Sequence, residues 1–148
     1  MSESSGSQDL SGPTLVVDSW PVLEWLRKRE PAHSLFAEIL EAASARELHL
    51  EMSRINYGEV FYNIVHRWGL EHAESYRGKV MALPITLISV DDALIDEAVA
   101  LKSIYPIAYA DAFAAALAIR TDAPVVTGDP DFRKLAGLGV VKLRWLGA

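Results

Sequence analysis

The chain of 148 residues contains no cysteine. Disulfide bonds, thiolate metal sites and a cysteine nucleophile are therefore excluded, which leaves oxygen and nitrogen groups as ligands for any functional site. Long apolar runs are missing too. The longest uncharged apolar stretch, VMALPITLISV at 80–90, is far shorter than the ~20 residues that cross a bilayer. We expect no membrane span.

Positive charge is also scarce. Fourteen Lys and Arg residues against twenty Asp and Glu residues give a formal net charge of −6, which argues against a broad basic surface for polyanions. Acids that are gathered in one pocket and neutralised by divalent metal would, however, present a different charge to a phosphate. Net charge alone therefore does not exclude a nucleic-acid substrate.

Length and composition fit one domain. Domains commonly run ~100–150 residues, and 51% hydrophobic with 23% charged residues is the balance of an ordinary folded protein. The start, MSESSGSQDLSGP, is polar and lacks the basic and apolar regions of a signal peptide. We expect residues 1–13 to be a flexible segment, residues 14–148 to form the domain, and the protein to be cytoplasmic.

Strand and helix patterns alternate along the chain. β-branched and alternating apolar runs predict strands at 14–17, 48–52, 85–90, 124–127 and 140–146. Helical spacing predicts helices near 20–29, 35–40, 54–68, 71–83, 107–120 and 130–136, and another that Asp91 caps. This alternation predicts an α/β fold with a parallel sheet covered on both faces.

Two aspartates follow predicted strands. Asp18 and Asp129 would lie beyond the carboxyl ends of strands, where sites form in doubly wound sheets. Each also begins a predicted helix, and Asp is a favoured helix cap. The sequence leaves both interpretations open.

Two more acids lie on predicted helices. Asp111, in IAYADAFAAALAI, has no basic residue within four positions, so burying its charge would cost several kcal/mol unless it were protonated or bound a cation. Its alternative is a water-facing position. Glu59 shares a polar, nearly uncharged helix edge with Asn56, Asn63 and His66. That edge is either simply solvated or a place where Asn56 and Asn63 orient the carboxylate or donate to a phosphate.

Together these four acids form a set of hard oxygen ligands. Such a set suits Mg²⁺ or Mn²⁺ and is poor for zinc. Two such ions, ~3.5–4 Å apart, serve phosphodiester-cleaving enzymes. The combination therefore indicates a substrate that carries phosphate.

Four segments of the chain match one known pattern: LVVDSW at 15–20, INYGEVFYNI at 55–64, AYADAFAAALA at 108–118 and TGDPDF at 127–132. With them, the chain resembles the PIN-domain ribonucleases, in particular the VapC toxins of prokaryotic toxin–antitoxin pairs. The resemblance implies a three-layer α/β/α PIN-like fold around a mostly parallel sheet of four to five strands. It also implies a Mg²⁺- or Mn²⁺-dependent endoribonuclease that hydrolyses RNA through metal-activated water. Its catalytic, metal-binding acids would be Asp18, Glu59, Asp111 and Asp129.

The resemblance suggests supporting roles as well. Ser19 and Thr127 would hold the carboxylates by hydrogen bonds, and Asp131 would support the cluster unless it only caps the following turn. Arg133 and Lys134 directly follow the cluster and could contact an RNA backbone, or form an ordinary solvated helix end.

Partners are implied in the same way. VapC-like proteins resemble one another in forming homodimers and in being held inactive by a VapB-type antitoxin that packs on surface helices. Apolar side chains of the first helices are candidates for this contact, with core packing as the alternative. These residues are Trp20, Trp25, Leu26 and Phe36.

Two other classes share parts of the outline. Haloacid-dehalogenase or receiver-type phosphotransferases need a second Asp two residues after the first, or an acidic pair before the strand, and a lysine near a later strand end. Here Trp20 follows Asp18 at that spacing, and no lysine follows the strand at 124–127 until Lys134. A non-catalytic PIN-like scaffold should have lost some of the acids, whereas this chain retains four.

Overall fold

The computed structural model describes residues 12–148, so the expected flexible segment 1–13 lies outside the described residues except for its last two. Within this part, five strands form one sheet in the order β3-β2-β1-β4-β5, and all four pairings are parallel. The strands are β1 (Thr14–Val17), β2 (His49–Ser53), β3 (Thr86–Ile88), β4 (Val125–Thr127) and β5 (Leu143–Trp145). The predicted parallel α/β sheet is confirmed.

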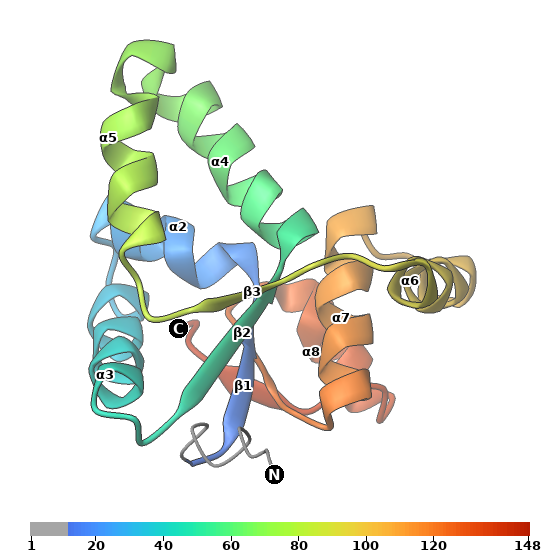
Figure 1. The fold of residues 1–148 in the computed structure, drawn as a ribbon. Coiled ribbons are helices and arrows are strands. Elements are labelled where there is room, and N and C mark those ends of the chain that lie inside the picture. Colours follow the sequence, from blue (N-terminus) through green and yellow to red (C-terminus); the bar gives the residue numbers. More distant parts are fainter. Residues whose placement is uncertain (1–11) are drawn as a thin grey trace, which may run out of the picture.

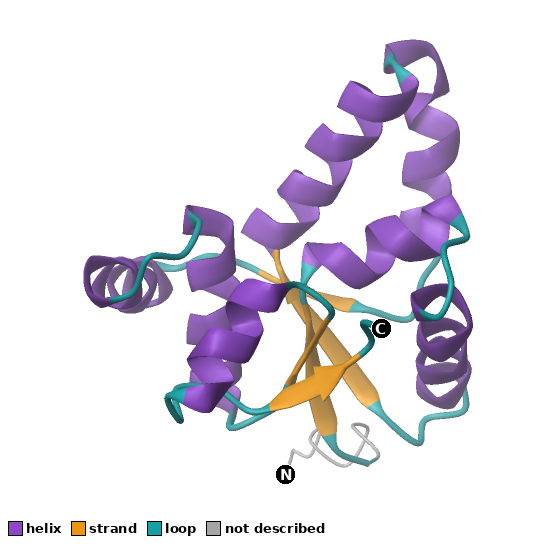
Figure 2. Ribbon diagram, turned by 180° about the vertical axis from the view of Figure 1, so that it is seen from behind, coloured by secondary structure: helices purple, strands orange, loops and turns teal. Residues whose placement is uncertain are grey.

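Seven helices connect the strands within residues 12–148. They are α2 (Ser19–Arg27), α3 (Ala32–Ser44), α4 (Arg54–Trp68), α5 (Leu70–Met81), α6 (Asp92–Ile104), α7 (Tyr109–Thr121) and α8 (Pro130–Gly137). Helices α2 to α5 cover one face of the sheet and α6 to α8 the other (Figures 1 and 2). This is the expected three-layer arrangement.

The central strands β1 and β4 are apolar on both sides because both faces of the sheet are covered. Neighbouring residues of a strand point to opposite faces, so Val16 and Val125 pack into the core under α6 to α8, while Val17 and Val126 pack under α2 to α5. This is why the sequences of β1 and β4 read as continuous apolar runs and not as alternating ones.

The predicted element boundaries differ most at the edges of the sheet. Strands β3 and β5 pair on one side only and are three residues each, shorter than the runs at 85–90 and 140–146. Helix α3 is longer than the apolar pattern at 35–40 indicated. An apolar run locates a strand, but its length depends on how far a neighbouring strand offers hydrogen bonds.

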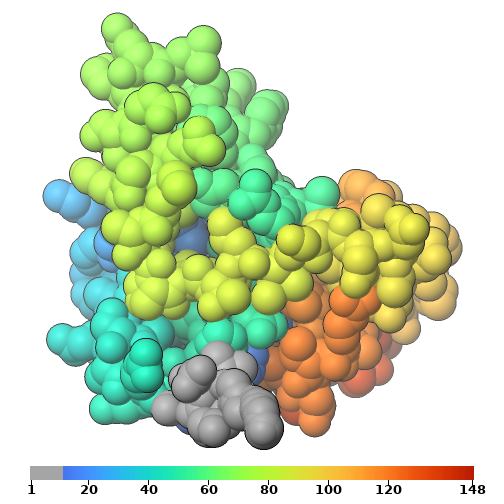
Figure 3. Space-filling view, in the orientation of Figure 1, coloured from blue at the N-terminus to red at the C-terminus, as the bar shows by residue number. Residues whose placement is uncertain are grey.

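The strand order places a crevice beside β1. The chain adds β2 and β3 on one side of β1 and then β4 and β5 on the other, and ligands of open parallel sheets bind outside the carboxyl ends at such a reversal. At this end of the sheet, the α4–α5 hairpin projects outward and leaves a hollow between itself and α6–α7 (Figure 3). None of the helices in residues 12–148 has the length and apolar character to cross a membrane.

Candidate functional site

Three carboxylates from distant parts of the chain meet at this end of the sheet. Asp18 follows β1, Asp111 lies in the first turn of α7, and Asp129 precedes α8. One oxygen of each lies within 4.8 Å of the others. Parallel strands bring their carboxyl ends to one edge of the sheet. Helix α7 supplies the third acid from the helical layer formed by α6 to α8.

Asp18 is almost completely buried, with 1% of its surface exposed. Its side chain makes no capping hydrogen bond to α2. Instead, Thr127 Oγ1 donates to Asp18 Oδ2 at 2.9 Å, and the buried Oδ1 has no hydrogen-bond partner among residues 12–148. Burial raises the pKa of Asp18 to about 7, with the negative charges of Glu59 and Asp129 adding to it and the Thr127 hydrogen bond opposing it. Capping does not explain this aspartate.

Asp111 is buried as well and does not face water. The alanines around it let α7 pack closely, so that the whole segment from Asp111 to Ala118 is buried. Burial, followed by the negative charges of Asp18, Asp129 and Glu59 in that order, raises the pKa of Asp111 to about 8. A carboxylate in this position is stable only when it is protonated or paired with a cation.

Glu59 lies at the side of the three aspartates. Its Oε1 accepts a hydrogen bond from Ser19 Oγ at 2.6 Å, which joins α4 to the start of α2. The charge of Glu59 raises the pKa of both Asp18 and Asp111, so its carboxylate faces the same pocket. Its half-buried position leaves it more accessible than Asp18.

The TGDPDF loop holds the third aspartate. The Asp129 backbone N–H donates to Thr127 Oγ1 at 3.0 Å, and Asp129 Oδ1 accepts from the Asp131 N–H at 3.0 Å. Asp129 therefore caps α8 and is at the same time a member of the three-aspartate cluster. The Asp131 carboxylate lies 3.8 Å from Lys134 Nζ and contributes the smallest of the charges that act on Asp111.

Within residues 12–148, the buried side chain of Asn56 makes no hydrogen bond to the Glu59 carboxylate. Its Oδ1 accepts from Ser53 Oγ at 2.6 Å, and its Nδ2 donates to the carbonyl oxygen of Ala110 at 3.0 Å. Asn56 thus fastens the start of α4 to the residue before Asp111. Asn63 donates to the backbone carbonyl of Glu59 at 2.8 Å.

Gly128 and Trp20 support the site in a way that sequence reasoning missed. A Cβ at Gly128 would overlap the Trp20 indole, so the ring of α2 packs directly on the backbone of the Asp129 loop. A glycine between Thr127 and Asp129, straight after a strand, is the signal of close backbone approach that could have indicated this contact.

The expected antitoxin contacts on the first helices need one correction. Phe36 is fully buried in the core, so of its two open interpretations core packing holds and a surface contact does not. Trp20, Trp25 and Leu26 are half-buried and pack against the same core. Periodicity identifies an apolar side chain but not which side of the helix another layer covers.

The two basic residues after the cluster are exposed but differently engaged. The Arg133 guanidinium carbon lies 3.9 Å from the centre of the Trp145 ring. Lys134 lies beside Asp131, as described above. No direct contact joins either side chain to the three clustered aspartates in the described interactions.

The three-aspartate cluster can bind a metal ion. All donors are carboxylate oxygens, the set that hard divalent cations prefer. The unpartnered, buried Asp18 Oδ1 is a group that a cation would satisfy. A cation would also offset the mutual repulsion that raises the pKa values of Asp18 and Asp111.

Comparison with known proteins agrees with this geometry. The model of the PIN domain family matches residues 15–138. No curated protein is significantly similar in sequence to this chain.

Several solved structures share the fold at low identity. A chain of the VapBC2 complex of Rickettsia felis, bound to a DNA fragment of its promoter, has a TM-score of 0.67 at 14% identity, over 88% of this chain and 97% of that one. Mycobacterium tuberculosis VapC20, a sarcin–ricin loop cleaving toxin, has a TM-score of 0.66 at 14% identity, over 81% and 93%. A chain of VapBC-1 from nontypeable Haemophilus influenzae has a TM-score of 0.62 at 15% identity, over 90% and 98%.

Proposed function

Because the chain belongs to the PIN domain family, we propose that it is a divalent-metal-dependent endoribonuclease and a VapC-type toxin of a toxin–antitoxin pair. Its substrate is RNA, its metal is Mg²⁺ or Mn²⁺, and its place of action is the cytoplasm. The observation that carries the proposal is the meeting of Asp18, Asp111 and Asp129 within 4.8 Å, with one buried Asp18 oxygen left without a partner.

The four acids have distinct parts in this proposal. Asp18, Asp111 and Asp129 are the principal metal ligands, and Glu59 completes the set from α4, where Ser19 fixes its orientation. When bound, divalent ions would activate the attacking water and stabilise the charge of the departing 3′ oxygen.

The surrounding groups keep the acids in place. Thr127 fixes Asp18 through its hydroxyl hydrogen and Asp129 through its oxygen. The Asp18 carboxylate is also buried, with 1% of the residue exposed. No side-chain nucleophile is required, since water attacks phosphorus.

Two partners follow from the same proposal. Two of the similar structures are those of VapBC2 and VapBC-1, which supports a VapB-type antitoxin for this chain. We further propose a homodimer. The antitoxin would inhibit by obstructing access to the acidic cluster.

The test is cleavage of a labelled RNA pool by purified protein, with Mg²⁺, with Mn²⁺ and with EDTA. The proposal predicts cleavage with metal, none with EDTA, and products that carry 5′-phosphate and 3′-hydroxyl ends. Asp18→Asn, prepared in parallel, should be inactive and so exclude a contaminating nuclease. Equal cleavage by Asp18→Asn, or cleavage that persists in EDTA, would contradict the proposal.

A further inference from the structure

Two basic side chains follow the acidic cluster, and the structure distinguishes between them. The Arg133 guanidinium lies over the Trp145 ring, with its central carbon 3.9 Å from the ring centre, and forms no ion pair with a carboxylate in residues 12–148. Lys134 has Asp131 at 3.8 Å as its partner. Only Arg133 combines a fixed position with an unpaired charge.

The Arg133–Trp145 stack is built on the same strand and loop that hold the acids. Trp145 is the sheet partner of Thr127, and the N–H of Leu146 donates to the Thr127 carbonyl at 2.9 Å. Thr127 in turn contacts Asp18 and Asp129. Arg133 follows Asp129 by four residues, about one turn of α8. Ring and guanidinium are therefore fixed relative to the cluster.

The indole itself has little freedom. A Cβ at Gly147 would lie 2.7 Å from Trp145 Cζ2, so the backbone of the last residues lies against the ring. The Trp145 Nε1 is buried without a hydrogen-bond partner in the described part of the chain. Because the indole N–H has no hydrogen-bond partner, packing against Arg133 and Gly147 determines the position of the Trp145 ring.

A guanidinium that lies flat on an aromatic ring keeps its N–H groups available at its edge. These donors form the planar fork that matches two phosphate oxygens, and less conformational freedom is lost when they bind. In a chain of net charge −6, one unpaired cation beside an acidic pocket would be a specific contact and not part of a general basic surface.

We propose that Arg133 contacts an RNA phosphate next to the one that is cleaved, and that Trp145 is a positioning residue that presents the Arg133 guanidinium. Lys134 does not take this role because its ammonium group is paired with the Asp131 carboxylate. The inference rests on the proposed ribonuclease function and deepens it by assigning a phosphate contact on the α8 side of the acidic cluster.

The test measures binding of a fluorescently labelled single-stranded RNA by anisotropy over a series of salt concentrations. All proteins carry Asp111→Asn, which prevents cleavage. We expect Arg133→Ala to weaken binding about tenfold and to lower the slope of log K against log salt by about 0.7, the value for one lost phosphate contact on a single strand. Trp145→Ala should do nearly the same, and the double variant should be no worse than either single one.

Two matched variants control for charge, and one controls for folding. Lys134→Ala and Arg144→Ala remove the same charge from exposed neighbours of Arg133 and Trp145 and should change the affinity less than twofold. Trp145→Phe keeps a ring under Arg133 and should restore most of the binding. A merely structural role of Trp145 would lower the melting temperature without changing the salt slope.

The outcomes separate the two proposals. Wild-type protein that cleaves RNA with Mg²⁺, together with Arg133→Ala that binds like its parent or like Lys134→Ala, would overturn the Arg133 contact alone. If Trp145→Ala weakened RNA binding while Arg133→Ala left it unchanged, the positioning role of Trp145 would be overturned. Wild-type protein that neither binds nor cleaves RNA would overturn the ribonuclease function, and this inference with it.

Discussion

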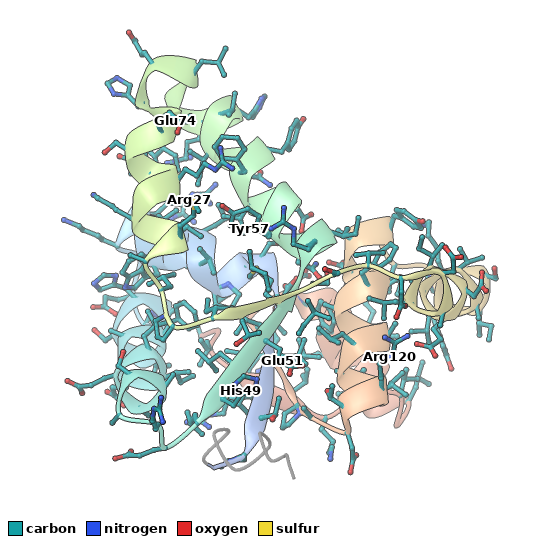
Figure 4. The ribbon with its side chains drawn as sticks, in the orientation of Figure 1. Arg27, His49, Glu51, Tyr57, Glu74 and Arg120 are labelled. Atoms are coloured by element: carbon teal, nitrogen blue, oxygen red, sulfur yellow. The ribbon has the colours of Figure 1, made fainter. Side chains whose placement is uncertain are left out.

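Two strand–helix junctions of this molecule place an aspartate at the same local position and use it in opposite ways. Asp91 precedes α6, is exposed, and accepts a hydrogen bond from the Leu94 N–H at 2.8 Å. Arg120 of α7 (Figure 4) donates to Asp91 Oδ1 at 3.4 Å. The hydrogen bonds from Leu94 and Arg120 lower the pKa of Asp91. Asp18 precedes α2, is buried, makes no cap, and has its pKa raised to about 7 by burial.

The difference comes from residues that are remote in the sequence. A cation from α7 neutralises Asp91, whereas the acid of α7 and the glutamate of α4 add negative charge around Asp18. Both aspartates fit the rule for helix caps, but only Asp91 is explained by it. An acid at a strand end is thus a candidate ligand when its surroundings leave it buried and unpartnered.

The largest expected difference between the junctions is in catalysis. Asp111→Asn keeps the size of the side chain but removes one charge from the cluster, so RNA cleavage should fall by at least about 10²–10³-fold. Asp91→Asn should leave the cleavage rate within about twofold. Initial rates on one RNA at saturating Mg²⁺ measure both. Similar losses in the two variants would show that the junctions do not differ in function.

The second difference is in the pH dependence of stability without metal. Asp18 and Asp111 have folded-state pKa values of about 7 and 8, against 3.8 ordinarily. The folded state therefore holds more protons than the unfolded state. The stability that these two protonated carboxyl groups contribute is fully present below about pH 4 and should be lost as the pH rises to 8.

Denaturant titrations in EDTA at several pH values measure this fall. Asp18→Asn should flatten it and be the more stable protein at pH 8. Asp91 should act in the opposite direction, because its lowered pKa adds stability above about pH 4 that is lost below it. A wild type whose stability is constant from pH 4 to pH 8 would contradict the raised pKa values.

The third difference is in the response to metal. Mg²⁺ or Mn²⁺ at about 100 times its dissociation constant should stabilise the wild type by about 2.7 kcal/mol, or several degrees in melting temperature. Asp91→Asn should show the same shift, and Asp18→Asn a much smaller one. Equal shifts in all three proteins, measured by thermal unfolding at pH 8, would place the metal elsewhere.

The smallest expected difference concerns the third junction, between β4 and α8. Gly128→Ala should destabilise the protein by about 1–3 kcal/mol, because the new methyl group overlaps Trp20. Gly78→Ala is the matched control: nothing lies within 4 Å of its Cβ, and in α5 the change should stabilise by about 0.5–1 kcal/mol. Trp20→Leu combined with Gly128→Ala should recover part of the loss. Urea unfolding measures all of these variants, and a neutral Gly128→Ala would argue against the contact.

Much of the fold was predictable from local pattern. Apolar runs located all five strands, and the spacing of apolar residues located the helices, because each of these elements buries a regular face. Phe36 shows the limit: its apolar character was evident, but its complete burial depends on α3 packing against a layer formed by other segments.

The candidate site was less predictable. Strand ends and an unpaired Asp111 drew attention to the acids as a set of oxygen ligands, and resemblance to the PIN domain then assigned them to one catalytic site. Helical register placed Asn56 beside Glu59, yet its amide bonds to Ser53 and Ala110, because those partners lie within reach in the folded chain. The pairing of Arg133 with Trp145 had no local signal at all, since the two residues meet only through the sheet.

The central claim is that Asp18, Asp111 and Asp129, with Glu59 beside them, hold divalent metal in one pocket. A crystal grown at pH 8 with millimolar Mn²⁺ and measured at the manganese absorption edge tests it most directly. We predict that the strongest anomalous peak lies among the three aspartates and in contact with Asp18 Oδ1. An anomalous map without a peak there, from protein that is saturated with Mn²⁺, would contradict the account.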